Sequence, residues 1–290
     1  MIVDLSEFKT GVCDKLRQVT FCATIATQMG DTLLEVYEIP TDECPFLITD
    51  LFEIDGFALN SLDIAPTNSL RMTPQNSIIE ICTVITHKPH SLNVKNEVFL
   101  NNWRKTYTKL KPKHGIANIT LDEIKHDIVG IHIRLTDRIS RWPSQGSITK
   151  FQYERFVTKK IPWIIKMANE NNFFVFLASD NLVADQEVRS KLRPHVRLIE
   201  SSKEWVKSGR RQTDGITFVE DLFWLSKSKY IYSTTGGGVP LTASLIGDIN
   251  SSVQIWTEEK LFFRSLVFLR RVAAWFKILI YRFIFKSNNI

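Results

Sequence analysis

In the second half of the chain, short continuous apolar runs alternate with segments of helical periodicity. The runs predict strands at 128–134, 173–178, 196–199, 230–233 and 253–256. The segments between them predict helices at 152–169, 183–192, 217–226 and 239–246, and Pro162 either kinks the first helix or opens a second one. A strand that is apolar at every residue is buried on both faces. Strict alternation of such strands with helices predicts an α/β fold with a parallel, doubly wound sheet.

The first half of the chain is less regular. Its predicted elements are a helix that follows Gly11, two strands and a second helix, at 12–29, 32–39, 77–85 and 94–110. Residues 40–77 are rich in Pro, Asp and Asn and read as irregular, and residues 111–115 form a breaker cluster. We therefore expect an N-terminal domain (1–125), a C-terminal domain (126–258) and a tail (259–290).

The charge balance of the chain narrows the classes of partner. The chain has 290 residues and a net charge of +6, which suits acidic partners. Much of the excess lies in the last thirty residues, so we predict no nucleic-acid binding. The N-terminal segment has no basic region and no long apolar stretch, and the cysteines show no metal-ligand spacing. We expect a cytoplasmic location, no signal peptide and reduced thiols.

Polar groups follow three of the predicted strands. Arg134 ends the first strand, Asp180 follows the second, and a Ser-Thr-Thr-Gly-Gly-Gly run at 233–238 follows the strand 230–233. Because the carboxyl ends of parallel strands meet at one edge of a sheet, we expect these groups to share a crevice. An arginine can grip a diphosphate, an aspartate can accept from a base or ribose, and glycine-rich backbone can approach phosphate closely.

These motifs resemble those of a known family of fucosyltransferases. The segment 132–138, His-Ile-Arg-Leu-Thr-Asp-Arg, resembles the His-x-Arg-x-Thr-Asp-Lys motif of α-1,6-fucosyltransferases. Related forms occur in nodulation, α-1,2- and protein O-fucosyltransferases. Segments 176–181, 211–226 and 232–236 match further motifs of this group in the same order, while the match of 11–17 to its glycine-rich turn is looser.

The resemblance implies a GT-B-like fold, in which two Rossmann-like domains face each other across a crevice. It also implies an inverting transferase that uses GDP-fucose as donor, needs no metal or other cofactor, and acts on a glycan or lipid-linked oligosaccharide. The Asp-x-Asp pattern typical of metal-dependent transferases is absent from the sequence. Two alternatives stay open: another GDP-sugar as donor, and a non-catalytic protein that binds a sugar nucleotide on a membrane.

Arg134 is the candidate for the central catalytic role. The departing GDP gains negative charge on its β-phosphate, and a planar guanidinium can neutralise it with two hydrogen bonds. His132 lies on the same strand face and either supports the donor or is a core residue. Asp137 either pairs with Arg134 or holds the loop, and a role as general base is the third alternative.

The remaining candidates concern the binding of the donor and of the acceptor. We expect Asp180 to accept hydrogen bonds from guanine, or else to cap the next helix. Asp221 is expected inside a helix with Arg211 as its partner. The phosphate contacts are expected from the loop residues Ser233, Thr234, Thr235, Gly236 and Gly237. Gly11 and Asp14, at the start of the first helix, are placed on the acceptor or phosphate side.

The tail at 261–286 mixes aromatic and aliphatic residues with six cations and no carboxylate. Its uncharged stretches are shorter than the ~20 residues that span a bilayer. This composition is typical of a helix that lies on anionic lipid, although a helix that crosses back onto the fold is an open alternative. We therefore predict peripheral attachment to the inner face of a membrane.

Deletion of residues 261–290 is expected to release the protein from anionic vesicles, because it removes cations that each contribute about 1 kcal/mol near such a surface. High salt is expected to weaken the binding of the intact chain in the same way. Vesicle co-sedimentation of both proteins is the measurement. Aggregation of the shortened chain, or loss of its nucleotide affinity, would instead show that the tail belongs to the fold.

Overall fold

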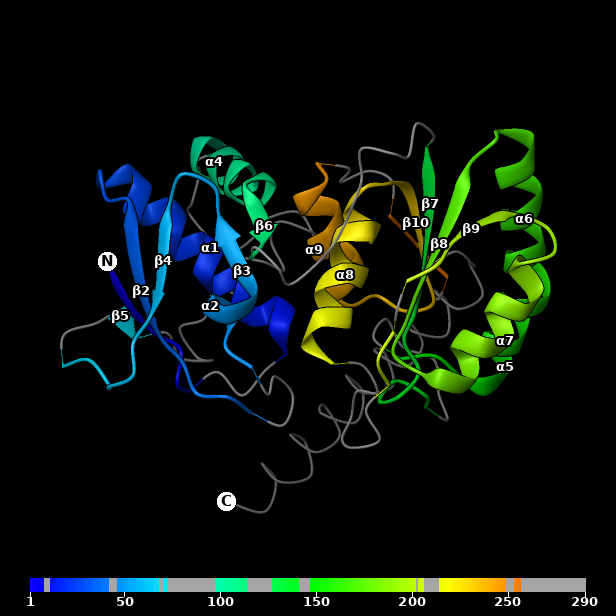
Figure 1. Cartoon of the computed structure of the whole chain (residues 1–290), viewed down its shortest axis with the longest axis horizontal. Helices are drawn as coiled ribbons and strands as arrows, with labels where there is room; N and C mark the ends of the chain where they lie inside the picture. The colour runs from blue at the N-terminus through cyan, green and yellow to red at the C-terminus, as the bar shows by residue number, and fades with distance from the viewer. Residues whose placement is uncertain are drawn as a thin grey trace, which may run out of the picture.

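The computed structural model shows two parallel sheets with a layer of helices between them (Figure 1). It describes residues 1–7, 11–41, 46–67, 70–71, 97–113, 127–140, 147–201, 203–205, 214–248 and 253–256. The tail, the predicted strand at 77–85 and the predicted boundary near residue 126 all lie outside these residues. None of the described helices is long and apolar enough to cross a membrane.

The first sheet has the strand order β4-β2-β1-β5, and all of its pairs are parallel. Its strands are β1 (Ile2–Asp4), β2 (Leu33–Tyr37), β4 (Ala58–Ser61) and β5 (Leu70–Arg71). The helix α1 (Val12–Gln28) connects β1 with β2 and confirms the predicted helix at 12–29. Both neighbouring strands contain buried apolar residues, Val3 in β1 and Leu34 and Val36 in β2, and the buried face of α1 belongs to the same apolar cluster.

The second sheet has the order β11-β10-β7-β8-β9 and is parallel throughout, as predicted. Its strands are β7 (Ile128–Ile133), β8 (Phe174–Ser179), β9 (Arg197–Ile199), β10 (Ser228–Ser233) and β11 (Val253–Ile255). All six residues of β7 are buried, because the strand is central and covered on both faces. The five predicted strands of this half are thereby confirmed.

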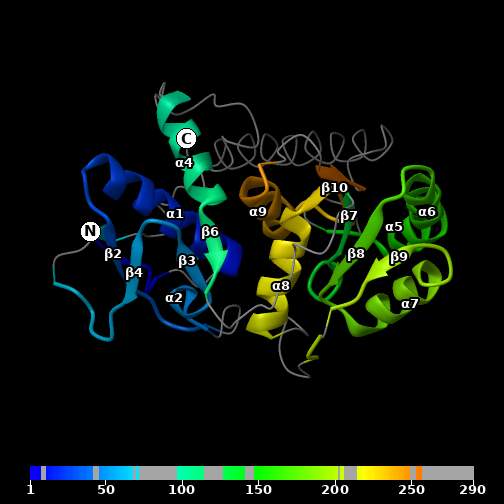
Figure 2. The same cartoon turned by 45° about the horizontal axis from the view of Figure 1, so that its top comes forward.

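Helices cover both faces of the second sheet (Figures 1 and 2). The outer layer consists of α5 (Lys150–Arg155), the π-helical turn η2 (Phe156–Lys160), α6 (Ile161–Glu170) and α7 (Leu182–Leu192). The inner layer consists of α8 (Gly215–Ser226) and α9 (Gly238–Ile246), which face the first sheet. Pro162 lies in the first turn of α6, directly after the π-helical turn η2, so the helical path runs from Lys150 to Glu170 with an irregular turn just before the proline.

One apolar cluster joins the two sheets. It contains core residues of α1 and of α4 (Glu97–Thr108) together with core residues of α8 and α9. The closest approach to the second sheet is at Gly130, where a Cβ atom would lie 2.7 Å from Cδ2 of Leu225 on α8. This packing fixes the inner helices against both sheets and thus sets the positions of their N-termini.

The prediction that residues 40–77 are irregular is wrong in part. This segment contains α2 (Ile48–Leu51) and three short strands, β3 (Phe52–Ile54), β4 and β5. Strands of two to four residues are too short for a periodic pattern, and β3 pairs with the distant strand β6 (Leu110–Pro112). Two residues of the predicted breaker cluster therefore lie in β6, where Pro112 is tolerated because the ribbon has only two strands.

Candidate functional site

Arg134 directly follows β7 and is held by its neighbours in one orientation. Its Nε and Nη2 atoms donate to Oδ1 and Oδ2 of Asp137 at 3.0 Å each, and its backbone N–H donates to Oγ1 of Thr234 at 3.1 Å. Burial lowers the pKa of the Arg134 guanidinium, but the hydrogen bond and charge of Asp137 outweigh burial and raise it. A fixed, permanently charged fork therefore stands at the carboxyl end of β7.

Asp137 is the partner that orients the Arg134 guanidinium. Pairing with Arg134 was one of the two structural roles that the sequence left open for Asp137, the other being to hold the loop. Burial acts to raise the pKa of Asp137, but the hydrogen bond and charge of Arg134 prevail and lower it. A carboxylate with a lowered pKa is a weak proton acceptor. The geometry thus supports a positioning role for Asp137 over a role as general base.

Asp180 joins the end of β8 to the loop that follows β7. Its Oδ1 accepts from the backbone N–H of Leu135 at 2.9 Å, its Oδ2 accepts from the hydroxyl of Thr136, and Oδ2 lies 4.0 Å from Nε of Arg134. Burial raises the pKa of Asp180, against the effect of these bonds. The helix-capping alternative is wrong, because Asn181 caps α7 by accepting from the N–H of Ala184.

The loop after β10 packs against the end of β7. Nδ1 of His132 lies 2.9 Å from Oγ of Ser233, the Thr234 N–H donates to the His132 carbonyl at 3.0 Å, and all three side chains are buried. Oγ1 of Thr235 is also buried, and no hydrogen-bond partner within the described parts of the chain is found for it. These contacts fix the strand end from which α9 starts.

Two helix N-termini meet beside Arg134. Gly237 precedes the first turn of α9, and a Cβ atom at this position would lie 3.9 Å from Nη1 of Arg134. A Cβ atom at Gly238 would lie 2.7 Å from Cβ of Cys13 and 3.8 Å from Nη2 of Arg17, both on the first turns of α1. Gly11, the N-cap of α1, lies at the same place. The positive ends of two helices and two guanidinium groups therefore face one region, which suits an anion.

Cys13 and Arg17, on either side of the predicted Asp14, were missed by the sequence analysis. Asp14 forms an ion pair with Arg17, in which Oδ1 and Nη1 are 3.1 Å apart. The sequence does show that Cys13 and Arg17 lie in the first turns after Gly11. Their approach to Arg134, however, is seen only in the packing of α9 on α1. Their contribution is a second cation at the same crevice.

Asp221 is a buried carboxylate on α8 that lies beside Lys203. Its Oδ2 lies 3.4 Å from Nζ of Lys203. The same Nζ atom lies 3.1 Å from Oδ1 of a second carboxylate, Asp185. Arg211, the predicted partner, lies outside the described residues. Burial raises the pKa of Asp221 to about 6, and the charge of Lys203 opposes the shift. Among the described residues, no group donates a hydrogen bond to its buried Oδ1.

A small cavity of about 30 Å³ brings these groups together. Four predicted site residues line it, namely His132, Arg134, Asp180 and Asp221. Such a volume holds about one water, so a nucleotide would lie over its mouth rather than inside it. No group of three or more metal-ligating side chains is present within the described ranges. The arrangement can bind a diphosphate through fixed cations and helix N-termini, and it can accept hydrogen bonds through Asp221.

Comparisons with known proteins show the fold. No protein-family model matches the sequence, and no curated protein sequence matches it. The crystal structure of POFUT1 in complex with GDP-fucose superimposes with a TM-score of 0.51 at 10% sequence identity, over 88% of this chain and 97% of that one. A second crystal form of that complex gives a TM-score of 0.49 at 10% identity, over 87% and 95% of the two chains. The chain thus shares a fucosyltransferase-like α/β fold, and at this identity the likeness extends to the fold alone.

The raised pKa of Asp221 predicts a pH-dependent contribution to stability. The folded protein holds the proton up to about pH 6, whereas the unfolded chain releases it near the ordinary value of 3.8. The contribution is therefore largest below about pH 4 and falls by about 3 kcal/mol as the pH rises past 6. Asp221→Asn removes it. Urea unfolding from about pH 4 to pH 7 is expected to show the variant gaining stability relative to the parent protein as the pH rises.

The control for this measurement is Asp31→Asn, because the Asp31 carboxylate is about half exposed to water. This variant also removes one carboxylate, so a trend with pH that both variants share would be a general effect of the change in net charge. If the difference in the free energy of unfolding between Asp221→Asn and the parent were constant over the whole range, the buried carboxylate would not be responsible.

Proposed function

We propose that the chain is a glycosyltransferase that transfers fucose from GDP-fucose, with inversion and without a metal, to a glycan or lipid-linked oligosaccharide. The observation that carries the proposal is the Arg134 guanidinium, fixed by Asp137 at the strand ends where the N-terminus of α9 begins. The fold shared with POFUT1, which was crystallised with GDP-fucose, supports the choice of donor. On this proposal, the two sheets belong to two Rossmann-like domains that face each other across the crevice.

In the proposed reaction, Arg134 stabilises the departing GDP. Asp137 occupies the edge of the guanidinium formed by Nε and Nη2. We assign the edge formed by Nη1 and Nη2 to the β-phosphate, since Nη1 lies on the side of Gly237 and of the α9 N-terminus. As the bond between the sugar and the phosphate breaks, negative charge grows on oxygens that face a cation already in place. Such preorganisation typically contributes ~10²–10³ in rate for one donor.

Asp221 is the acceptor that we assign to the bound donor. Both oxygens of Asp180 already accept hydrogen bonds from the loop after β7. To recognise guanine as well, each oxygen would have to accept a further hydrogen bond from the base. In contrast, Oδ1 of Asp221 is buried, lines the cavity, and has no hydrogen-bond partner within the described segments. A buried acceptor without a partner is unfavourable by about 1–3 kcal/mol, which a donor N–H or hydroxyl group would relieve. We therefore place Asp180 in support of the Arg134 loop.

Arg134→Ala is expected to lower the rate of transfer by at least ~10²-fold while the fold stays intact, because no other guanidinium holds its place at the end of β7. Arg134→Lys is also expected to be slow, since an ammonium group cannot form two parallel hydrogen bonds with a phosphate. Release of GDP from GDP-fucose in the presence of an acceptor preparation is the measurement. Arg193→Ala is the matched control, because Arg193 is an exposed arginine at the C-cap of α7 that also pairs with a carboxylate, Glu200. Near-normal turnover of Arg134→Ala would remove this residue from the leaving-group role.

GDP is expected to bind at least about tenfold more tightly than ADP or UDP, because we assign Asp221 to accept from the two N–H groups on the guanine edge. Adenine and uracil lack this pair of donors. Calorimetry with the three nucleotides measures this preference. EDTA is expected to leave GDP release unchanged, since arginine replaces the metal at the phosphate. Equal affinities would contradict base reading by an aspartate, and a strict requirement for Mn²⁺ would contradict a metal-free mechanism. Turnover with GDP-mannose in place of GDP-fucose would identify another GDP-sugar as the donor.

A further inference from the structure

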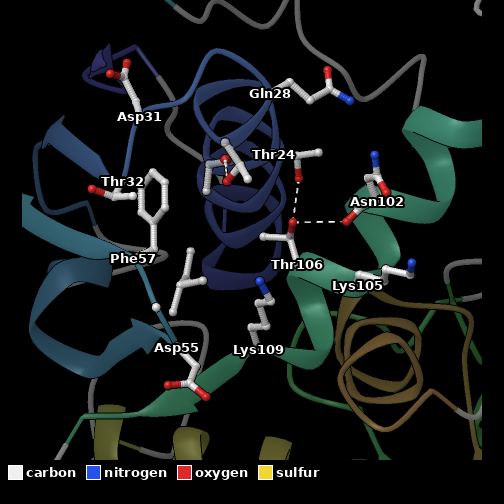
Figure 3. Close-up of a pocket in the computed structure, with 14 residues that line it drawn as sticks. Thr24, Gln28, Asp31, Thr32, Asp55, Phe57, Asn102, Lys105, Thr106 and Lys109 are labelled. Carbon is white, nitrogen blue, oxygen red and sulfur yellow. Dashed lines mark hydrogen bonds between the residues drawn. The ribbon is translucent and has the colours of Figure 1, made fainter.

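A second, larger cavity lies at the opposite end of α1 from Arg134. Its volume is about 270 Å³, and it lies between the C-terminal half of α1, the helix α4 and the turn between β3 and β4 (Figure 3). Ligand sites for drug-sized molecules usually measure ~300–1,000 Å³, so this one suits a ligand of about one ring. The cavity plays no part in the proposed transfer reaction.

The two helices turn polar faces toward this cavity. On α4 the lining residues Asn102, Lys105 and Thr106 follow helical spacing, and Lys109 directly follows the end of this helix. On α1 the lining residues Thr24 and Gln28 are also spaced as helical neighbours (Figure 3). The deep hydroxyl groups bond to each other, since Oγ1 of Thr24 and Oγ1 of Thr106 are 2.8 Å apart. The floor is thus satisfied within the protein. The amide and ammonium groups nearer the mouth are the ones placed to meet a ligand.

The third wall is an aromatic ring presented by a tight turn. Gly56 has a φ angle of +74°, a conformation that favours glycine, and the N–H of Phe57 closes the turn by donating to the Ile54 carbonyl at 2.9 Å. The Phe57 ring is half-buried and lines the cavity. An apolar ring face opposite polar side chains suits a ligand with one apolar face and a polar rim.

The residues that line the cavity carry charges of both signs. Two carboxylates, Asp31 and Asp55, and two ammonium groups, Lys105 and Lys109, line it. Asp31 lies 3.5 Å from the Met1 amino group, and Asp55 lies 3.0 Å from Nζ of Lys111. Each of these ion pairs uses Oδ2 of the carboxylate, which leaves Oδ1 to accept from a ligand. The lining therefore offers donors and acceptors together, which suits a ligand whose hydroxyl groups both donate and accept hydrogen bonds.

From this size, aromatic wall and lining of donors and acceptors we infer that the cavity binds one neutral pyranose unit of a carbohydrate. The hydroxyl groups would accept from Asn102 and Lys109 and donate to Asp55, and the C–H face would lie on Phe57. The residues of α1 that line this cavity are 10–15 positions from Cys13, which corresponds to about 15–22 Å along the helix. A sugar bound there is therefore not the one that reacts at Arg134.

The test measures the binding of small sugars to the full chain. Saturation-transfer NMR detects the binding, and no nucleotide is present. The probes are methyl β-galactoside and N-acetylglucosamine, with glucuronate and inorganic phosphate as charged comparisons. We expect at least one neutral probe to bind with a dissociation constant on the order of 1 mM, the range for a ligand of so few atoms. Saturating GDP is not expected to displace it. Binding is thereby measured independently of donor and transfer, so failure of the proposed function would leave this result unchanged.

Two variants locate the bound sugar. Lys109→Ala and Asn102→Ala each remove one hydrogen-bonding group near the mouth and leave the contact between Thr24 and Thr106 in place, so both are expected to fold, as circular dichroism would show. Each is expected to weaken binding roughly tenfold. Lys166→Ala, at an exposed lysine on α6, is the matched control and is expected to bind as the parent does.

Three results would overturn the inference. The first is that no neutral probe binds at tens of millimolar. The second is that GDP displaces the sugar, which would place it at the other site. The third is that only glucuronate or phosphate binds, which would make the cavity an anion site of the two lysines.

Discussion

The pairing of β7 with β8 on one side and with β10 on the other is the constraint on which the site depends. In this register His132 lies opposite both Ala178 and Ser233, so the three strands end at the same level. Arg134, Asp180 and Thr234 then emerge together, although they are 46 and 54 residues apart along the chain. A shift of one residue in either pairing would turn these side chains to the opposite face and separate them.

Ionisable side chains are buried around the carboxyl ends of β7, β8 and β10, although burial disfavours their charged forms. Asp180 and Asp221 both have raised pKa values because they are buried. The hydrogen bonds and cations around each carboxylate lower its pKa, but they do not fully offset the effect of burial. Replacing such groups by apolar residues would often stabilise a fold. Carboxylates and a guanidinium that persist in one crevice are therefore typical of a binding site, and the two helix N-termini beside Arg134 give that site a preference for an anion.

The sequence predicted the second sheet well because continuous apolar strands and amphipathic helices are local signals. It also predicted that Arg134, Asp180 and the loop at 233–238 would lie together, since strand ends in a parallel sheet share one edge. It failed where contacts are between distant segments. Lys203 belongs to no motif and becomes the partner of Asp221 only through packing. The strand β3 forms because it pairs with β6, which lies nearly sixty residues later in the chain. The approach of Cys13 to Gly238 depends on how α1 packs against α9, which no local pattern encodes.

The helix α1 links the two regions, and a buried ion pair fixes its position. Nζ of Lys15 lies 3.3 Å from Oε2 of Glu38 and donates to the Ile39 carbonyl at 3.1 Å, while Oε1 of Glu38 accepts from the N–H of Ile48 at the start of α2. Both side chains are fully buried, so loss of either would leave a charge without a partner in the core, which is typically unfavourable by ~3–5 kcal/mol. This pair ties α1 to β2 and α2. The first turn of α1 is thereby held against α9 beside Arg134 while its last turns form a wall of the distant cavity, so the separation of the two regions is set by one rigid helix.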